Sequence, residues 1–154
     1  MNITVIAVGK LNKPYLKNGV ADFVKRLSKY CSLNIIEVKE ENNKEKDEII
    51  KQKEAERIFK HINPQSLTVA LDSCGDSMTS EDFAAFINKQ AVFGTSHITF
   101  IIGGSVGLSK DIIKSCQKVI SFSKMTFPHQ LFRLILLEQI YRAFKIIKGE
   151  PYHK

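Results

Sequence analysis

The sequence lacks tryptophan and has only three cysteines, and its Cys and His residues are too scattered to form a metal site. Cys31, Cys74 and Cys116 are widely separated, no C-x-x-C pair occurs, and no Cys/His grouping has the spacing of a zinc site. We therefore expect buried, reduced thiols and no bound metal.

Long hydrophobic runs are also absent. The aliphatic block "LILL" at 134–137 is far too short to span a bilayer. The opening "MNITVIAVGK" has no basic stretch before its apolar run and no small-residue cleavage site, so it predicts a first strand rather than a signal peptide. We expect a cytoplasmic protein with no membrane segment.

The common phosphate-binding signatures are missing, although residues 98–107, "ITFIIGGSVG", run from an apolar stretch into a glycine-rich turn. Its glycines read G-G-x-x-G, which is neither G-x-G-x-x-G nor G-x-x-x-x-G-K-[ST], and Lys110 falls inside the next helix. A phosphate cradle is disfavoured. A glycine pair taken alone indicates a tight turn that needs left-handed residues.

The positive charge is concentrated in the last third of the chain. The net charge is +7 over 154 residues, and residues 97–154 hold nine Lys and Arg against three Asp and Glu. A localised basic surface is typical of proteins that bind a polyanion, most often nucleic acid. A merely basic soluble protein is the alternative.

The hydrophobic pattern predicts one α/β domain over residues 1–154, a mostly parallel sheet with helices on both faces. The segment at 39–62, which is dense in both charge signs, is expected to be a helix with a solvated surface. Thr79 is expected to cap the amide of Asp82. Strands are expected at 2–8, 33–38, 66–72, 98–102 and 118–123, and helices at about 14–30, 39–62, from 80, 110–116 and 130–148.

Three loops follow strand ends in this arrangement, after Leu71, Ile102 and about Phe122, and ligands of such sheets bind at the carboxyl ends of strands. The third loop, "FSKMTFPHQ", carries hydroxyl and amide groups but no acidic group. We expect a carboxylate-free pocket for a flat, neutral heterocycle such as adenine.

The last helix places Arg133 within its apolar arc, where the arginine needs a partner or a ligand, because an unpaired buried charge is very costly. The opposite side is too apolar for a free surface and predicts half of a subunit contact. Glu138 and Arg142 are spaced to pair at i, i+4. The arc that should face the sheet contains Phe132, Leu136, Leu137, Ile140, Ala143, Phe144 and Ile147.

The segments "FIIGGSVGLS" and "SFSKMTFPHQLFRLILLEQIYRAFKIIKGEPYHK" closely resemble the bacterial ribosomal RNA large subunit methyltransferase H family. These enzymes are pseudouridine N3-methyltransferases of the SPOUT superfamily of knotted methyltransferases. "ITVIAVGKL" and "LTVALDSCGDSMTSEDFA" extend the resemblance over almost the whole chain, whereas residues 40–56 match no motif.

The resemblance implies a C-terminal trefoil knot whose loops form the pocket for S-adenosylmethionine. It also implies a homodimer in which the tail residues Tyr152, His153 and Lys154 reach toward the partner's site. The cofactor contacts carried over by position are Leu71, Gly103, Phe122, Ser123, Lys124, Met125, Thr126 and Phe127.

The implied reaction is methylation of N3 of a pseudouridine in 23S ribosomal RNA, on the assembled ribosome. Removal of the N3 proton needs a base or a stabilising cation, and Arg133 is the favoured candidate, with a structural ion pair as its alternative role. His129, Glu138 and His153 are further catalytic candidates, and His129 could instead cap the last helix. The expected RNA contacts are Lys124, Arg142, Lys145, Lys148, Tyr152 and Lys154.

Three other functions fit parts of the pattern. A non-catalytic RNA-binding module explains the charge but not the glycine turn, and a nucleotide hydrolase lacks its phosphate-binding lysine and acidic pair. A SPOUT enzyme acting on another RNA, such as transfer RNA, differs only in its substrate.

Overall fold

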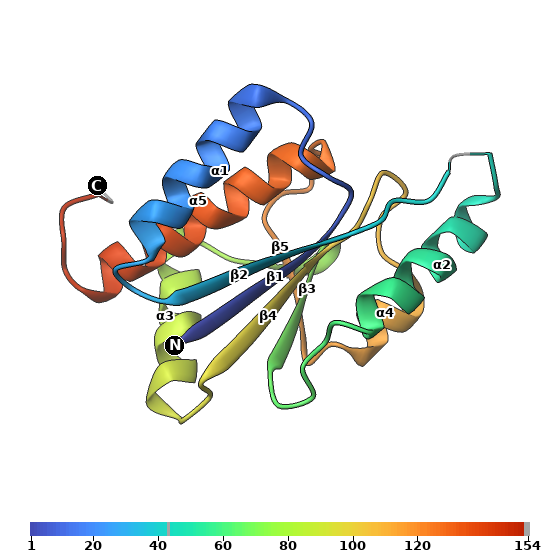
Figure 1. The fold of residues 1–154 in the computed structure, drawn as a ribbon. Helices are drawn as coiled ribbons and strands as arrows, with labels where there is room; N and C mark the ends of the chain where they lie inside the picture. Colours follow the sequence, from blue (N-terminus) through green and yellow to red (C-terminus); the bar gives the residue numbers. More distant parts are fainter. Residues whose placement is uncertain (43, 153–154) are drawn as a thin grey trace.

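A computed structural model describes residues 1–42 and 44–152. Its five strands form one parallel sheet in the order β2-β1-β4-β3-β5. Figure 1 shows α1, α3 and α5 on one face and α2 and α4 on the other, which confirms the predicted fold class. The elements are β1 (Asn2–Val8), α1 (Pro14–Leu27), β2 (Ser32–Val38), α2 (Asp47–Phe59), β3 (Leu67–Ser77), α3 (Ser80–Val92), β4 (His97–Ile102), α4 (Lys110–Ser115), β5 (Lys118–Ser121) and α5 (His129–Ile147).

The side-chain alternation of the strands divides the core into two layers. In β1, Ile3 and Val5 pack against α1, α3 and α5, whereas Ile6 and Val8 belong to the smaller layer under α2 and α4. All four are at most 1% exposed, as expected for a parallel sheet covered on both sides.

The predicted start of α3 is confirmed, and the predicted start of the charged helix is wrong. The Thr79 hydroxyl accepts from the Asp82 amide at 3.1 Å, and the Asp82 carboxylate accepts from the Thr79 amide, which forms a capping box. The charged helix α2 begins only at Asp47, because side chains of α2 bind the backbone of Lys39 and Glu41 in the connection that precedes it.

Strand β3 continues past the turn that the sequence predicted after residue 72. Leu71 and Asp76 both pair with Ile120 of β5, so residues 72–75 loop out between them. A Cβ on Gly75 would lie 2.6 Å from the Val119 carbonyl carbon, closer than real side chains approach. Glycine is therefore required where this segment packs against the backbone of β5.

Helix α5 buries the predicted arc, since Leu136, Leu137, Ile140 and Ala143 are fully buried. Its outer side is only partly available to a partner, because α1 packs against it in the same chain. Leu134 contacts Gly19 there.

The expectation of buried thiols is correct for Cys31 and wrong for Cys74, which is exposed. Cys74 lies in the segment that loops out of β3, whereas Cys31 belongs to the core, where burial raises the pKa of its thiol to about 11.

No helix in the described part of the chain is long and apolar enough to cross a membrane.

Candidate functional site

A cavity of about 490 Å³ opens at the carboxyl ends of β3, β4 and β5. The loops that follow these three strands line it, as the strand-end rule predicts for a parallel sheet. Of the residues predicted to bind a cofactor, the structure brings together Leu71, Gly103, Phe122, Ser123, Met125, Thr126 and Phe127. The exposed Lys124 is not among the lining residues.

The glycine turn meets a different need at each of its three glycines. Only Gly107 has a left-handed conformation, with φ of 84°. A Cβ on Gly103 would lie 2.8 Å from the Gly107 carbonyl carbon, and one on Gly104 would lie 2.9 Å from the side chain of Val8. The turn therefore needs its glycine pair for close packing rather than for left-handed backbone.

The cavity is not free of carboxylates, because Asp72 lines it. The expectation of a carboxylate-free pocket is therefore wrong. It rested on the absence of acidic groups in the loop after β5 alone. One Asp72 oxygen accepts from the Cys74 amide at 3.0 Å. An acidic wall favours a cationic or hydroxyl-bearing ligand over a phosphate.

His129 lies in the cavity wall at the first turn of α5. Its side chain makes no capping hydrogen bond, so the alternative role as a helix cap is wrong. Its Nε2 is buried without a hydrogen-bond partner and lies 3.7 Å from a carboxylate oxygen of Glu40. Gly9 leaves room for this pair, because a Cβ there would be 3.0 Å from Nε2.

Arg133 lies one turn further along α5 and is 1% exposed. Its guanidinium pairs with the carboxylate of Glu37 at the end of β2 and donates to the carbonyl of Gly9 at 2.9 Å. Arg133 does not line the cavity. The structure therefore shows the buried ion pair that was the alternative role for this residue.

A second polar cluster lies at the other end of α5. Arg142 donates to Glu138 at 2.7 Å, which confirms the predicted pair, and the Tyr152 hydroxyl donates to the same carboxylate at 3.1 Å. Burial and the Glu138 charge raise the pKa of Tyr152. Glu138 and Arg142 follow His129 by nine and thirteen residues, which is about 14 and 20 Å along the helix. The cluster is thus remote from the cavity of its own chain.

The predicted RNA contacts have unequal availability. Lys124 and Lys148 are exposed, whereas Lys145 pairs with Glu150 at 2.5 Å. His153 and Lys154 lie outside the described residues. No group of three or more metal-ligating side chains occurs in residues 1–42 and 44–152.

Sequence reasoning missed two residues at this edge of the sheet. Asp72 directly follows the last apolar residue of the third predicted strand, a position that could have identified it. Glu54 lies in the charged helix, and its buried contact with Gly104 leaves no signal in the sequence.

Comparisons with known proteins agree on one family. Residues 1–153 match the family model described as predicted SPOUT methyltransferase. The ribosomal RNA large subunit methyltransferase H of Clostridium kluyveri is 55% identical over 159 residues, and that of Carboxydothermus hydrogenoformans is 53% identical. Each alignment covers 100% of both chains.

Solved structures share the fold at much lower identity. A probable methylase family protein from Haemophilus influenzae Rd KW20 has a TM-score of 0.53 and 12% identity. The match covers 99% of this chain and 70% of the Haemophilus chain. A probable methyltransferase from Bordetella pertussis Tohama I has a TM-score of 0.55 and 9% identity, covering 92% and 95%.

Proposed function

Because this chain belongs to the SPOUT methyltransferase family, we propose that it methylates N3 of a pseudouridine in 23S ribosomal RNA, with S-adenosylmethionine as donor. The observation that carries the proposal is the cavity at the ends of β3, β4 and β5, whose lining contains seven of the eight residues expected to contact the donor. The full-length relatives named as large-subunit ribosomal RNA methyltransferases support the choice of substrate.

The residues of the cavity fit S-adenosylmethionine. A volume of about 490 Å³ lies within the range of small-molecule sites. The aromatic rings of Phe122 and Phe127 provide apolar walls for an adenosine. The carboxylate of Asp72 suits the cationic and hydroxyl groups of the donor and disfavours a phosphate. When bound, the donor supplies a methyl group activated by its sulfonium.

We propose a trefoil knot around this cavity. Strand β5 pairs with β3 on the side away from β4, so the connection from β4 to β5 must cross β3. The close passage of Gly75 against Val119 and Ile120 supports a crossing in which residues 72–75 fold over β5.

The protein's part in the reaction is to align the base and to remove the proton from N3. We propose His129 as the acceptor of this proton, since it lies in the cavity wall and has an unpartnered buried nitrogen beside Glu40. Arg133 then acts as a positioning residue, because its bonds to Glu37 and Gly9 tie the first turn of α5 to the ends of β1 and β2.

We propose that the active form is a homodimer in which Glu138, Arg142 and Tyr152 serve the partner's cavity. Their distance from the cavity of their own chain, together with the exposed end of α5, supports this arrangement. His153 belongs to the same tail and is proposed to act with them. Each protomer would then contribute one end of α5 to each of two composite sites.

Among the proposed RNA contacts, Lys124 lies in the loop after β5 and Lys148 at the far end of α5, and both are exposed. Lys154 follows in the tail of the sequence. Arg142, Lys145 and Tyr152 would join them once RNA competes for their present partners. The basic surface is small, so we propose that the assembled ribosome, in the cytoplasm, supplies much of the recognition.

The test is methyl transfer from labelled S-adenosylmethionine to ribosomes that lack their native modifications, followed by mapping of the modified nucleotide. Label on N3 of one large-subunit pseudouridine is the expected result. Label only on transfer RNA would overturn the substrate. A folded protein that binds no donor would support the RNA-binding module, and ATP turnover would support the hydrolase.

A further inference from the structure

Glu54 is a carboxylate buried within the most highly charged helix of the chain. It is 2% exposed, although neighbouring side chains of α2 such as Glu56 are in water. Its Oε1 accepts a hydrogen bond from the amide of Glu41 at 3.0 Å. Its Oε2 is buried and has no hydrogen-bond partner among the described residues. Such a costly group in a fold needs an explanation.

The unpartnered oxygen of Glu54 faces the glycine turn of the cavity. A Cβ on Gly104 would lie 3.1 Å from Oε2 and 3.3 Å from Oε1. Gly104 lines the cavity, and its carbonyl accepts from the Gly107 amide at 3.1 Å to close the turn. The carboxyl group of Glu54 therefore packs beneath the backbone that lines the cavity.

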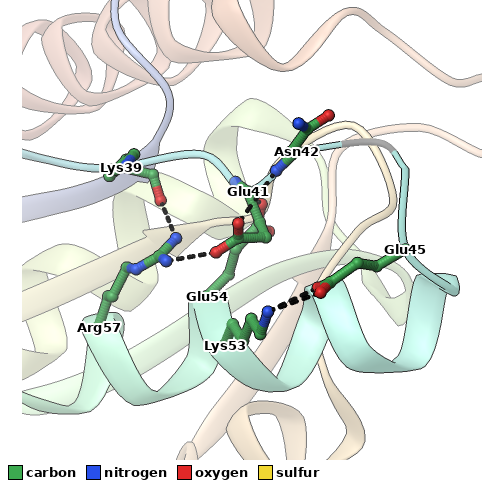
Figure 2. A network of polar contacts seen from close by, with 7 residues as sticks. All are labelled: Lys39, Glu41, Asn42, Glu45, Lys53, Glu54 and Arg57. Atoms are coloured by element: carbon green, nitrogen blue, oxygen red, sulfur yellow. Dashed lines mark hydrogen bonds and ion pairs between the residues drawn. The ribbon is translucent and has the colours of Figure 1, made fainter.

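The same carboxyl group holds the connection from β2 to α2, as Figure 2 shows. Arg57 reaches across this connection, donating to the Lys39 carbonyl at 2.8 Å and pairing with the carboxylate of Glu41. The hydrogen bond to Arg57 holds the pKa of Glu41 below its usual value. At the other end, Lys53 binds Glu45 at 2.7 Å.

We propose that Glu54 is a positioning residue of the donor cavity, which couples the connection at residues 39–42 and 44–46 to the glycine turn at residues 103–108. The inference rests on the proposed function only in naming S-adenosylmethionine as the ligand. It gives a role to part of the segment at residues 40–56 that matched no motif, since this segment contains Glu54 and its partner Glu41.

The test compares Glu54→Ala and Glu54→Gln with Glu56→Gln, an exposed glutamate on the same helix. Affinity for S-adenosylmethionine is measured by calorimetry, and amide hydrogen exchange is measured on the free protein. Glu54→Ala is expected to weaken binding about tenfold and to speed exchange in residues 103–108. Glu54→Gln keeps the hydrogen-bond acceptor and the shape of the side chain, so its donor affinity and amide exchange should stay close to those of the wild type. Glu56→Gln should change neither quantity.

A second variant covers the case in which Glu54→Ala fails to fold. Arg57→Gln removes the outer link to Glu41 at a partly exposed position. It should speed exchange in both residues 39–46 and residues 103–108. Faster exchange in residues 39–46 alone, or unchanged donor affinity and exchange in Glu54→Ala, would overturn the inference. A wild-type protein that binds no donor would overturn the proposed function instead, and the exchange data would still decide the coupling.

Discussion

Two charged side chains are buried in the described part of the chain, Arg133 and Glu54, and their surroundings differ. Arg133 has an ion pair and a backbone carbonyl as partners, whereas one oxygen of Glu54 has none. Both connect separate elements at the edge of the sheet where the cavity opens. At the scale of residues, the two buried charges of the described chain lie beside its proposed site.

Arg133→Ala should lower the free energy of unfolding by about 3 kcal/mol, since it removes a buried ion pair and a large buried side chain. Urea denaturation measures the loss. Arg26→Ala is the control, because its pair with Asp22 is about half exposed and is expected to contribute less than about 1 kcal/mol. Normal methyl transfer in a folded Arg133→Ala protein would contradict any role of this residue in the reaction.

Glu54 should give stability a pH dependence that Glu54→Gln lacks. Burial raises the pKa of Glu54 in the folded protein, the nearby Glu40 raises it further, and the Glu41 amide and Arg57 oppose the rise. The folded state thus keeps the proton to a higher pH than the unfolded chain. Stability from this group is full below the usual glutamate pKa and is lost as pH rises through the raised value.

Urea unfolding from acidic to neutral pH tests this sign. As pH rises, the unfolding free energy of Glu54→Gln should increase relative to that of the wild type. The same comparison with Glu56→Gln should show no such shift. A difference that does not change with pH, or that favours the wild type as pH rises, would refute the assignment.

Helices on the two faces of the sheet have different tasks. On one face, α5 lies between α1 and α3 and presents His129 at the cavity. On the other face, α2 packs on the sheet through Ile50 and Ile58 and supports the glycine turn through Glu54. The cavity therefore depends on elements from both layers, and α3 follows directly on the part of β3 that pairs with β5.

The capping box of α3 should contribute measurably to this arrangement. Thr79→Ala removes the side-chain acceptor of the Asp82 amide and is expected to cost about 1 kcal/mol of stability. Thr79→Ser keeps the hydroxyl and should lose much less. Thermal or urea unfolding of both variants measures the difference, and equal losses would rule out the cap as the cause.

On the scale of the whole molecule, the carboxyl edge of the sheet gathers the cavity from loops that are far apart in the sequence. The order β4-β3-β5 forces the last crossover past β3, and Gly75 packs directly against the backbone of Val119 and Ile120 in β5. The far end of α5 carries a polar cluster that is remote from the cavity of its own chain. These two features underlie the proposed knot and the proposed dimer.

Gly75→Ala should destabilise the fold by more than about 3 kcal/mol, because its Cβ would overlap the backbone of Val119 and Ile120. Gly19→Ala is the control, since it meets only the flexible side chain of Leu134 and lies in a helix, where alanine is favoured. Urea unfolding of the two variants should therefore give very different midpoints. Similar midpoints would show that Gly75 does not pack tightly against the backbone of Val119 and Ile120.

Subunit complementation tests the composite site. His129→Ala and Arg142→Ala should each be nearly inactive as homodimers. If the two residues act from different protomers, an equal mixture forms heterodimers with one intact site and should recover about a quarter of the wild-type rate. Mixed protein that stays inactive after subunit exchange would place both residues in one protomer's site.

Local sequence pattern is enough to predict several features of this fold. These are the order of strands and helices, the buried arc of α5, the capped start of α3 and the three loops at strand ends. Each depends on hydrophobic period or on a residue a few positions away. The long-range contacts do not follow from it. The partner of Arg133 lies 96 residues earlier in the sequence, and Asp72 lies at the register shift between β3 and β5. Glu54 packs against Gly104, which belongs to a distant part of the chain. Spacing in the sequence carries no information about such contacts, because the packing of the two layers brings these residues together.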